Sequence, residues 1–407
     1  MTRPLSHIRV LDLTRVLAGP WAAQNLADLG AEVIKIERPG TGDDTRTWGP
    51  PWLKDRDGKE TRESAYFLSV NRGKKSVTVD ISKPDGQALI RQLITHCDVL
   101  LENYKVGDLQ RYGLGYTDLA KINPGLIYCS VTGFGQDGPY ANRPGYDFVF
   151  QGMGGLMSIT GERDELPGGG PQKVGIAVTD VLTGMYASLA VTSALTYRQI
   201  SGIGQYIDMA LFDSIVAFNA NQMLNFWVSG NIPKRWGNAH VNITPYEVFP
   251  SADGFIILAV GNDSQFASFC KEAGRPELAT DPRFKTNPER LKHRDLLIPI
   301  VKAIILERPS KQWIRDLEAA NVPCGAINNM KEVFEDPHVQ HRNMRVDIPH
   351  PLSGTVPSVA SPMKFSATPI TYDQPPPLLG QHTDEILRGL LALDTAEIAR
   401  LRSTKII

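Results

Sequence analysis

Residues 8–37 contain the pattern that most constrains the fold. Residues 8–13 and 31–37 are short apolar runs typical of strands. Between them, Gly19 and Pro20 open a helix, since proline is tolerated in a first helical turn, and Gly30 ends it. A strand, a helix and a strand in this order make a right-handed parallel unit. We therefore expect an α/β fold built on a doubly wound parallel sheet.

The alternation of strands and helices continues beyond this unit. Apolar runs predict strands at 98–102, 126–132 and 205–209, and residues 84–97 carry an amphipathic helical pattern. The composition changes at 229–240, and 407 residues are more than one core usually supports. We expect a large domain over 1–228, a smaller α+β domain with its linker over 229–330, and a C-terminal segment, 331–407, that returns to the large domain.

Composition narrows the classes of function. A formal net charge of −1 gives no electrostatic case for binding nucleic acid or a membrane surface, and no apolar run reaches the length of a membrane span. Four scattered cysteines, without CxxC spacing, indicate buried thiols in a reducing compartment. The first residues lack the apolar core of a signal peptide. We expect a cytoplasmic protein, or one of the mitochondrial matrix whose presequence has been removed.

Asp180 is the candidate for chemistry. The apolar run 174–178 precedes it, and apolar residues at helical spacing follow it, so Asp180 lies where a strand or loop becomes a helix. In one interpretation Thr179 or Asp180 caps the helix by accepting hydrogen bonds from its free N–H groups. In the other, those N–H groups and the helix dipole hold an ionised carboxylate that acts as a nucleophile. This segment alone does not decide between them.

Basic residues follow several predicted strands. Arg38 ends the second strand, where an arginine suits a ribose that bears a phosphate, although it also fits an exposed surface charge. The loop after the first strand lacks the GxGxxG pattern, which weakens a dinucleotide-binding interpretation. Four further cations are expected near one sheet edge, where they either bind a phosphate-rich ligand or form a solvated rim: Lys74, Lys75, Lys105 and Arg111.

Several motifs in one order resemble a known family. They are VLDLTRVLAGP at 10–20, VIKIERP at 33–39, GDDTR at 42–46, NRGKKS at 71–76, ENY at 102–104, SVTGFG at 130–135, PGYD at 144–147 and PPLLGQHT at 376–383. Together they resemble the class III CoA-transferases, the family of formyl-CoA and carnitine CoA-transferases. The segments GDDTRTWGPP, KRWGNAH and PPPLLGQH are similar to the succinate–hydroxymethylglutarate branch in particular.

The resemblance implies a reaction and an architecture. Asp180 matches the family's nucleophile, which forms a mixed anhydride and then an aspartyl-CoA thioester. The substrates implied are succinyl-CoA and a dicarboxylic acid such as glutarate, 3-hydroxy-3-methylglutarate or itaconate. Coenzyme A enters as substrate and product, and no metal, nicotinamide or flavin is required. Two subunits are expected to interlock as a homodimer.

The resemblance also assigns binding residues. Those that match coenzyme A contacts are Leu17, Ala18, Arg38, Val79, Ser82, Asn103, Tyr104, Lys105, Arg111, Arg143 and Tyr146. Candidates for binding the acceptor acid are Arg46, Arg235 and His240, since a cation must meet the distal carboxylate. Asp147 is a further candidate for substrate contact.

Departures from the family pattern keep alternatives open. Formyl-CoA transferase carries a glutamine at the position of Leu17, so a substrate larger than formate or oxalate is favoured. The related α-methylacyl-CoA racemases use a histidine base where this chain has Tyr146, which weakens a racemase interpretation. A noncatalytic coenzyme A-binding protein, in which Asp180 is only a cap, and a hydrolase are the remaining alternatives.

Overall fold

The computed structural model describes residues 3–407, which divide into two compact units. The first unit contains the chain up to residue 156, residues 174–223 and residues 340–407. The second contains residues 157–173 and 224–339. Our expected boundaries at 229 and 330 lie near two of these divisions, but the short segment 157–173 was not expected in the smaller unit. Sequence patterns did not show it because this segment has neither strand nor long helix periodicity.

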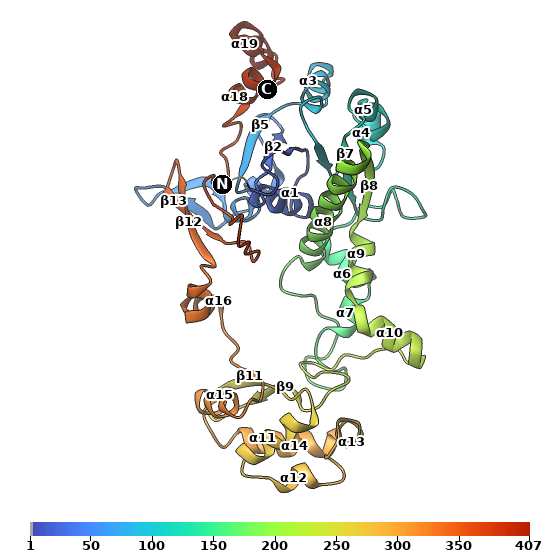
Figure 1. The fold of residues 1–407 in the computed structure, drawn as a ribbon, viewed down its shortest axis with the longest axis vertical. Coiled ribbons are helices and arrows are strands. Elements are labelled where there is room, and N and C mark those ends of the chain that lie inside the picture. The colour runs from blue at the N-terminus through green and yellow to red at the C-terminus, as the bar shows by residue number, and fades with distance from the viewer. Residues whose placement is uncertain (1–2) are drawn as a thin grey trace. The chain divides into compact units, whose positions relative to one another are not determined.

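A six-stranded parallel sheet forms the centre of the first unit (Figure 1). Its strands are β1 (Arg9–Asp12), β2 (Glu32–Glu37), β5 (Lys74–Thr78), β6 (Val99–Glu102), β7 (Ile127–Thr132) and β8 (Gln205–Ala210). They are ordered β5-β2-β1-β6-β7-β8, and every neighbouring pair is parallel. The strand order reverses between β1 and β6, as in a doubly wound fold. The expected parallel sheet is therefore confirmed.

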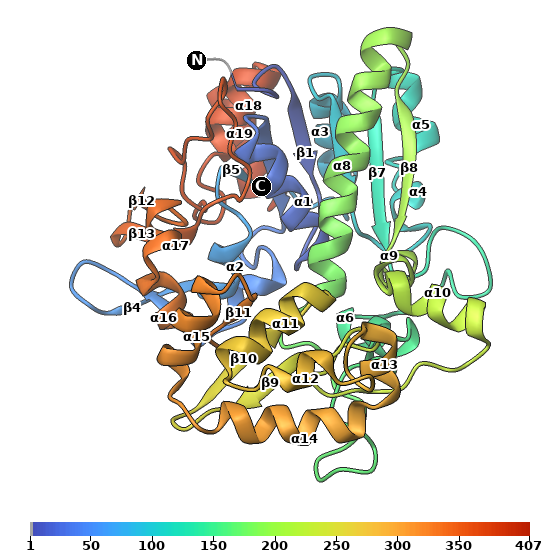
Figure 2. The same cartoon turned by 60° about the horizontal axis from the view of Figure 1, so that its bottom comes forward.

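Helices cover both faces of this sheet. Side chains alternate along a strand, so in β1 Leu11 joins the core on one face while Val10 faces the other. The first core also takes residues from α3 (Pro84–Ile94), α5 (Tyr116–Ile122), α18 (Thr383–Leu391) and α19 (Thr395–Ser403). The helices α1 (Ala18–Asp28) and α8 (Val178–Ser201) pack together against the other face (Figure 2).

Shorter elements complete the first unit. They are the turn η1 (Asp44–Thr47), the hairpin β3 (Trp52–Lys54) and β4 (Glu60–Ser64), α2 (Ala65–Ser69), α4 (Asp108–Arg111), α6 (Asp147–Met153), α9 (Leu211–Phe218) and the hairpin β12 (Arg345–His350) and β13 (Gly354–Val359). The C-terminal segment returns to β5, where the His382 N–H donates to the Ser76 carbonyl and the Asp80 N–H to the Ile406 carbonyl. These contacts join the C-terminal segment to the edge strand of the sheet.

The second unit combines a small antiparallel sheet with helices. The sheet is ordered β11 (Cys324–Gly325), β10 (Phe255–Ala259) and β9 (Tyr246–Pro250). Its helices are α11 (Asp263–Glu272), α12 (Glu277–Thr280), α13 (Asn287–Lys292), α14 (Arg294–Ile305), α15 (Ser310–Ala319) and α16 (Met330–Glu335). The helices α7 (Leu156–Ile159), α10 (Ala220–Ser229) and α17 (Pro337–His341) contain the division points. Phe249, Phe266 and Trp313 belong to its separate core.

Two expectations about apolar segments need correction. Residues 174–177 form a loop that leads into α8, which begins at Val178, so the strand alternative at this segment is wrong. We also expected no apolar run long enough to span a membrane, but α8 has 24 residues and is long and apolar enough by that criterion alone. Thr183, Ala187 and Val191 are buried, so one face of this helix packs within the core.

Candidate active site

Asp180 lies in the first turn of α8, which begins at Val178. Ala177 precedes the helix and supplies no side-chain cap. The carboxylate of Asp147, at the start of α6, accepts a hydrogen bond of 2.7 Å from the Thr179 N–H. Asp147 therefore performs the capping role that the sequence assigned to residue 179 or 180. The Asp180 carboxylate is therefore not the cap of α8.

Gln151 ties Asp147 to the loop before α8. Its Nε2 donates to the Asp147 carboxylate at 2.6 Å and to the Ile176 carbonyl at 3.3 Å. Its Oε1 accepts the Val174 N–H at 2.9 Å, and the side chain is fully buried. The amide thus fixes both the capping carboxylate and the chain that leads to Asp180. We did not predict Gln151, because the order of residues does not reveal which loop a buried amide will meet.

The N-terminus of α1 meets Asp180 from a second direction. The Ala18 N–H, in the first turn of α1, donates a hydrogen bond to the Asp180 carboxylate. The helices approach closely because Gly184 has no side chain, and a Cβ built there would lie 2.5 Å from the Ala18 carbonyl oxygen. Leu17 and Ala18, both predicted coenzyme A contacts, are buried at this junction. The first turns of two helices, where N–H groups favour negative charge, thus flank one carboxylate.

Burial and a neighbouring charge change the acidity of Asp180. Burial is the larger cause and the negative charge of Asp147 is the smaller one; together they raise the pKa of Asp180 to about 7. The hydrogen bond from the Ala18 N–H acts in the opposite direction, because it favours the anion. Near neutral pH the carboxyl is therefore divided between acid and anion. Its anion is more basic than an ordinary aspartate, which suits a nucleophile that attacks an acyl group.

Tyr66, on α2, faces the same carboxylates and was not predicted. Burial raises the pKa of Tyr66, and the negative charges of Asp180, Asp147 and Asp43 raise it further. Its ring contacts Trp48 edge to face, with ring centroids 5.0 Å apart. Trp48 lies in the GDDTRTWGPP motif.

A pocket of about 220 Å³ lies at the carboxyl edge of the sheet. Its walls come from the segments that follow β1, β2, β5 and β6, which is the switch point where doubly wound folds bind ligands. Four of the predicted coenzyme A contacts line it: Arg38, Val79, Ser82 and Tyr104. The structure therefore brings these four residues together around one cavity.

Arg15 also lines this pocket, and sequence reasoning missed it. The Arg15 N–H donates to the Asn103 side chain at 2.9 Å, and the Asn103 Nδ2 returns a bond of 2.8 Å to the Arg15 carbonyl. The Arg15 guanidinium lies 5.4 Å from the Tyr104 ring centroid. Asn103 thus fixes the end of β1 to the end of β6. The position of Arg15 directly after a predicted strand was the available signal.

Other predicted contacts lie outside the walls of this pocket. Lys105 is exposed, and Arg111 forms an ion pair with Asp108. Arg143 and Tyr146 lie in the exposed loop before α6, where Tyr146 is 72% exposed. Their contacts with coenzyme A stay predictions.

Two lysines expected at the ligand edge have structural partners instead. The Lys74 ammonium is buried and donates to Asp12 at 3.0 Å. Lys75 pairs with Glu32 at 2.9 Å and with Glu385 at 2.7 Å. Placement of these two ammonium groups at a phosphate ligand is therefore wrong, since carboxylates already neutralise them.

Arg46 also differs from expectation. It is only 7% exposed, and its guanidinium pairs with Glu37 at 2.7 Å and with Glu63 at 3.2 Å. It also donates to the Pro377 carbonyl at 3.0 Å and stacks on Phe67. Two carboxylates and a carbonyl satisfy this cation, so Arg46 holds the fold together and does not face an acceptor acid.

Arg235 and His240 belong to the second unit. The Arg235 guanidinium pairs with Asp164 and donates to the Ser158 carbonyl at 3.1 Å. The His240 Nδ1 accepts the Asn242 N–H at 3.0 Å, and burial lowers the pKa of His240. Their role toward the acceptor acid stays a prediction.

Residues 3–407 contain neither a candidate metal site nor a disulfide bond. Within residues 3–407, no group of three or more His, Cys, Asp or Glu side chains is arranged to hold a metal ion. Cys97, Cys129, Cys270 and Cys324 are all free thiols, and only Cys324 is partly exposed.

The fold and the site define an α/β protein with a ligand pocket at the switch point of a doubly wound sheet and a half-buried carboxylate beside two helix N-termini. Comparison with known proteins adds the family. The model of CoA-transferase family III matches residues 5–383. The chain therefore belongs to the family III CoA-transferases and is an enzyme of that family.

Three relatives show how close the match is. The succinate–glutarate CoA-transferase of Agrobacterium fabrum is 49% identical over 391 residues, which are 96% of each chain. The human succinyl-CoA:glutarate CoA-transferase is 44% identical over 405 residues, which are 100% of this chain and 90% of the human one. The crystal structure of a CAIB/BAIF family protein from Brucella suis has a TM-score of 0.84 and 45% identity, covering 96% of this chain and 100% of that one.

Proposed function

We propose that this enzyme transfers coenzyme A from succinyl-CoA to a second dicarboxylic acid of the glutarate, 3-hydroxy-3-methylglutarate or itaconate type. Two relatives that span nearly the whole chain are named for succinate or succinyl-CoA and glutarate. The observation that carries the mechanism is the half-buried Asp180 carboxylate, which has a raised pKa and accepts the Ala18 N–H.

Acyl-CoA binding is proposed at the switch-point pocket. Arg38 would meet the phosphorylated ribose, because a guanidinium binds phosphate through two parallel hydrogen bonds. Val79, Ser82 and Tyr104 line the same pocket and suit the adenine and the pantetheine chain. Arg15 adds a second guanidinium to the wall of this pocket.

The first half of the reaction moves coenzyme A onto Asp180 through a mixed anhydride. The carboxylate attacks the thioester carbonyl, the C–S bond breaks, and a mixed anhydride and CoA thiolate result. The thiolate then attacks the Asp180 acyl carbon of the anhydride. This step forms the aspartyl-CoA thioester and releases succinate.

The second half repeats these exchanges in reverse. The acceptor carboxylate attacks the aspartyl thioester, which gives a new anhydride and CoA thiolate. The thiolate then attacks the acceptor acyl carbon, forms the product thioester and returns Asp180 to its carboxylate. Each step exchanges one activated acyl group for another, so the reaction needs no energy input beyond the thioester.

The Ala18 N–H has a specific task in this sequence. Whenever a nucleophile attacks the Asp180 acyl carbon, negative charge develops on the Asp180 carbonyl oxygen. The Ala18 N–H already donates to this side chain, so it is placed to stabilise that oxyanion. Removing one such donor typically lowers kcat by about a hundredfold or more.

The candidates for binding the acceptor acid change. Arg46 is withdrawn as its partner because carboxylates within the fold satisfy the guanidinium. Arg235 and His240 remain candidates for the distal carboxylate. Asp147 is reassigned from substrate contact to positioning, since Thr179 and Gln151 occupy its oxygens.

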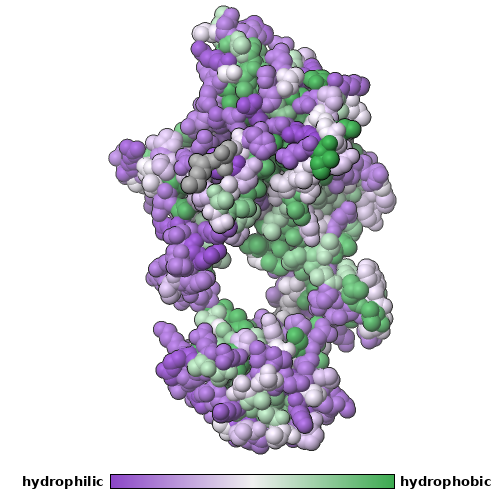
Figure 3. Space-filling view, viewed as in Figure 1, coloured by the Kyte–Doolittle hydropathy of each residue, from purple (hydrophilic) through white to green (hydrophobic). Residues whose placement is uncertain are grey.

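A homodimer is proposed from the exposed side of α8. Met185, Leu189 and Ile200 are 54%, 61% and 86% exposed and lie along one stripe of this helix. Figure 3 shows hydrophobic residues gathered over the part of α8 near α6 and α9. A second copy of the chain, interlocked with the first, would remove this stripe from water. The free thiols suit the proposed cytoplasmic or mitochondrial-matrix location.

A panel of carboxylic acids tests the proposed function. The enzyme is incubated with succinyl-CoA and each acid in deuterium oxide, and mass spectrometry identifies the acyl-CoA products. We expect thioesters of glutarate-type acids, no transfer by Asp180→Ala, and no deuterium at the α-carbon. Normal transfer by Asp180→Ala would exclude the nucleophile. Deuterium uptake without transfer would indicate a racemase.

A further inference from the structure

The turn between β1 and α1 has a strained backbone at Val16. This residue has φ of 71°, in the left-handed region that β-branched residues rarely adopt. Such a conformation is strained and persists only when its surroundings enforce it. Val16 stands two positions before Ala18, so it sets the direction in which α1 starts.

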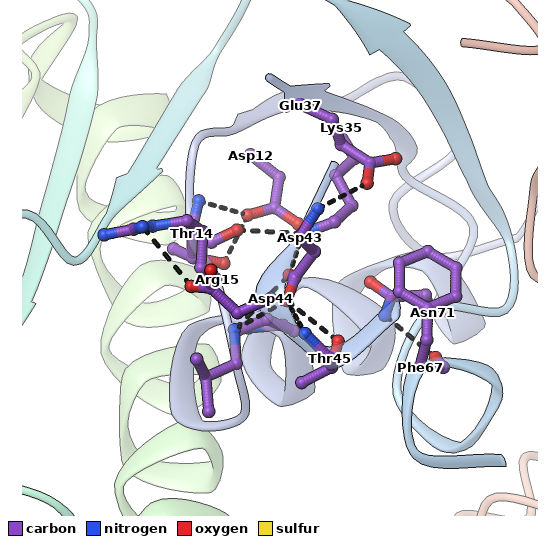
Figure 4. Close-up of polar contacts among 12 residues, drawn as sticks. Asp12, Thr14, Arg15, Lys35, Glu37, Asp43, Asp44, Thr45, Phe67 and Asn71 are labelled. Atoms are coloured by element: carbon purple, nitrogen blue, oxygen red, sulfur yellow. Dashed lines mark hydrogen bonds and ion pairs between the residues drawn. The ribbon is translucent and has the colours of Figure 1, made fainter. Parts of the chain in front are cut away.

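Asp43 holds the turn at Val16 through hydrogen bonds to its backbone. The Val16 N–H donates to both oxygens of the Asp43 carboxylate, at 3.2 and 3.3 Å. The same carboxylate accepts the Thr45 N–H at 3.0 Å and the Thr45 hydroxyl at 2.8 Å. Asp43 is only 1% exposed, so water does not compete for these bonds. Figure 4 shows the carboxylate at the centre of this group of contacts.

Lys35 fixes Asp43 and the other end of the turn. Its ammonium lies 2.9 Å from the Asp43 carboxylate and donates to the Thr14 carbonyl at 2.8 Å. Both charged side chains are 0% exposed. One buried ion pair therefore contacts the backbone at Thr14 and at Val16, on either side of Arg15. Burial raises the pKa of Asp43, but the Lys35 ammonium and the Thr45 hydrogen bonds outweigh it and lower the pKa to about 2.

We propose that the buried Lys35–Asp43 pair is a positioning element for the reaction: it holds Val16 in its left-handed conformation and thereby aims the Ala18 N–H at the Asp180 carboxylate. This inference rests on the proposed function. Lys35 and Asp43 also line the pocket, but lining the pocket does not require that they position Val16. A residue that only shapes the pocket would affect the binding of acyl-CoA, whereas a residue that aims Ala18 affects the chemical step.

Substitution in pairs separates these roles without burying a lone charge. The variant Lys35→Met/Asp43→Asn removes both charges but keeps an oxygen that accepts the Val16 N–H. The variant Lys35→Met/Asp43→Leu removes the acceptor as well. Replacing a buried ion pair by apolar groups is often neutral for stability. Adding Val16→Gly to the second variant removes the strain, because glycine adopts positive φ without steric cost.

The measurement is the single-turnover rate of acylation at saturating succinyl-CoA, with thermal unfolding to verify folding. We expect the leucine variant to react at least about tenfold more slowly than the asparagine variant, since small displacements of catalytic groups carry penalties of this size. Adding Val16→Gly should recover at least about fivefold. The matched control is Asp55→Asn. The Asp55 carboxylate also accepts two N–H groups, but it lies in the exposed β3–β4 turn, so this variant should keep the wild-type rate.

Equal rates for the asparagine and leucine variants would overturn the proposal, because the acceptor oxygen would then be irrelevant. So would a leucine variant that glycine at position 16 fails to rescue. A parallel assay of Asp180→Asn distinguishes failure of the proposed function from failure of the positioning role. If that variant turns over normally, the proposed function itself fails. If it is inactive while the position-43 variants behave alike, only the positioning role fails.

Discussion

At the scale of single residues, the decisive contact joins positions far apart in the chain. Asp147 and Gln151 come from α6, yet they cap α8 and set the charge around Asp180. The sequence pattern placed Asp180 at a helix start and left its two interpretations open. It could not resolve them because the capping carboxylate lies 32 residues upstream of the N–H that it accepts. Arg46 failed as a prediction for the same reason, since its carboxylate partners come from separate strands.

The raised pKa of Asp180 predicts a pH profile for acylation. The attacking form is the anion, so the rate should rise with pH through a midpoint near 7. Asp147→Asn removes the second cause of the shift, so the midpoint should move down toward the ordinary value of 3.8. Relative to its own plateau, this variant should keep more activity at pH 6 than the wild type. Rapid-quench acylation from pH 5 to 9 measures both profiles, and coincident midpoints would contradict the assigned cause.

At the scale of helices and strands, periodicity predicted most of the first unit. Strands expected at 98–102 and 126–132 occur at Val99–Glu102 and Ile127–Thr132, and the helix expected over 84–97 spans Pro84–Ile94. The apolar stretch 212–228 is divided into α9 and α10. Ala220 has a positive φ of 41° between them, a break that hydrophobic spacing alone does not encode.

The close approach of α1 and α8 predicts the effect of Gly184→Ala. The added Cβ would meet the Ala18 carbonyl oxygen at 2.5 Å and the Trp21 Cβ at 3.0 Å, so the helices must separate. We expect the free energy of unfolding to fall by about 1–3 kcal/mol, as for other overpacked sites. Acylation should also slow, because the displaced Ala18 N–H faces the nucleophile.

Gly389→Ala in α18 is the matched control. A Cβ at this helical glycine meets nothing within 4 Å, and alanine in a helix interior is favoured over glycine by about 0.5–1 kcal/mol. Chemical denaturation should therefore show a small gain in stability with unchanged acylation. Equal stability changes at positions 184 and 389 would show that the α1–α8 contact is not tight.

At the scale of the whole molecule, the sequence indicated two domains but not their complete membership. The segment 157–173 joins the smaller unit although it lies between two parts of the larger one. Local patterns describe how a segment folds, whereas membership of a unit depends on contacts between distant segments. The apolar outer stripe of α8 also follows from whole-molecule packing, since one side of the helix is already used within the core.

The exposed stripe predicts the oligomeric state. Leu189→Glu places a charge in the proposed dimer contact, so the mass measured by light scattering should fall from two chains to one. Ile122→Glu changes an exposed apolar residue at the end of α5, outside the stripe, and should leave the dimer intact. A wild-type protein that is monomeric at all concentrations would contradict the dimer. Binding of the wild type to lipid vesicles, abolished by Leu189→Glu, would indicate a membrane contact instead.

Covalent trapping of the enzyme during turnover tests the central claim most directly. The protein is mixed with succinyl-CoA, quenched with hydroxylamine or borohydride, digested and analysed by mass spectrometry. The account predicts a hydroxamate or a reduced side chain on Asp180, and no adduct in Asp180→Asn. An unmodified peptide around Asp180, under conditions in which product thioester forms, would contradict it.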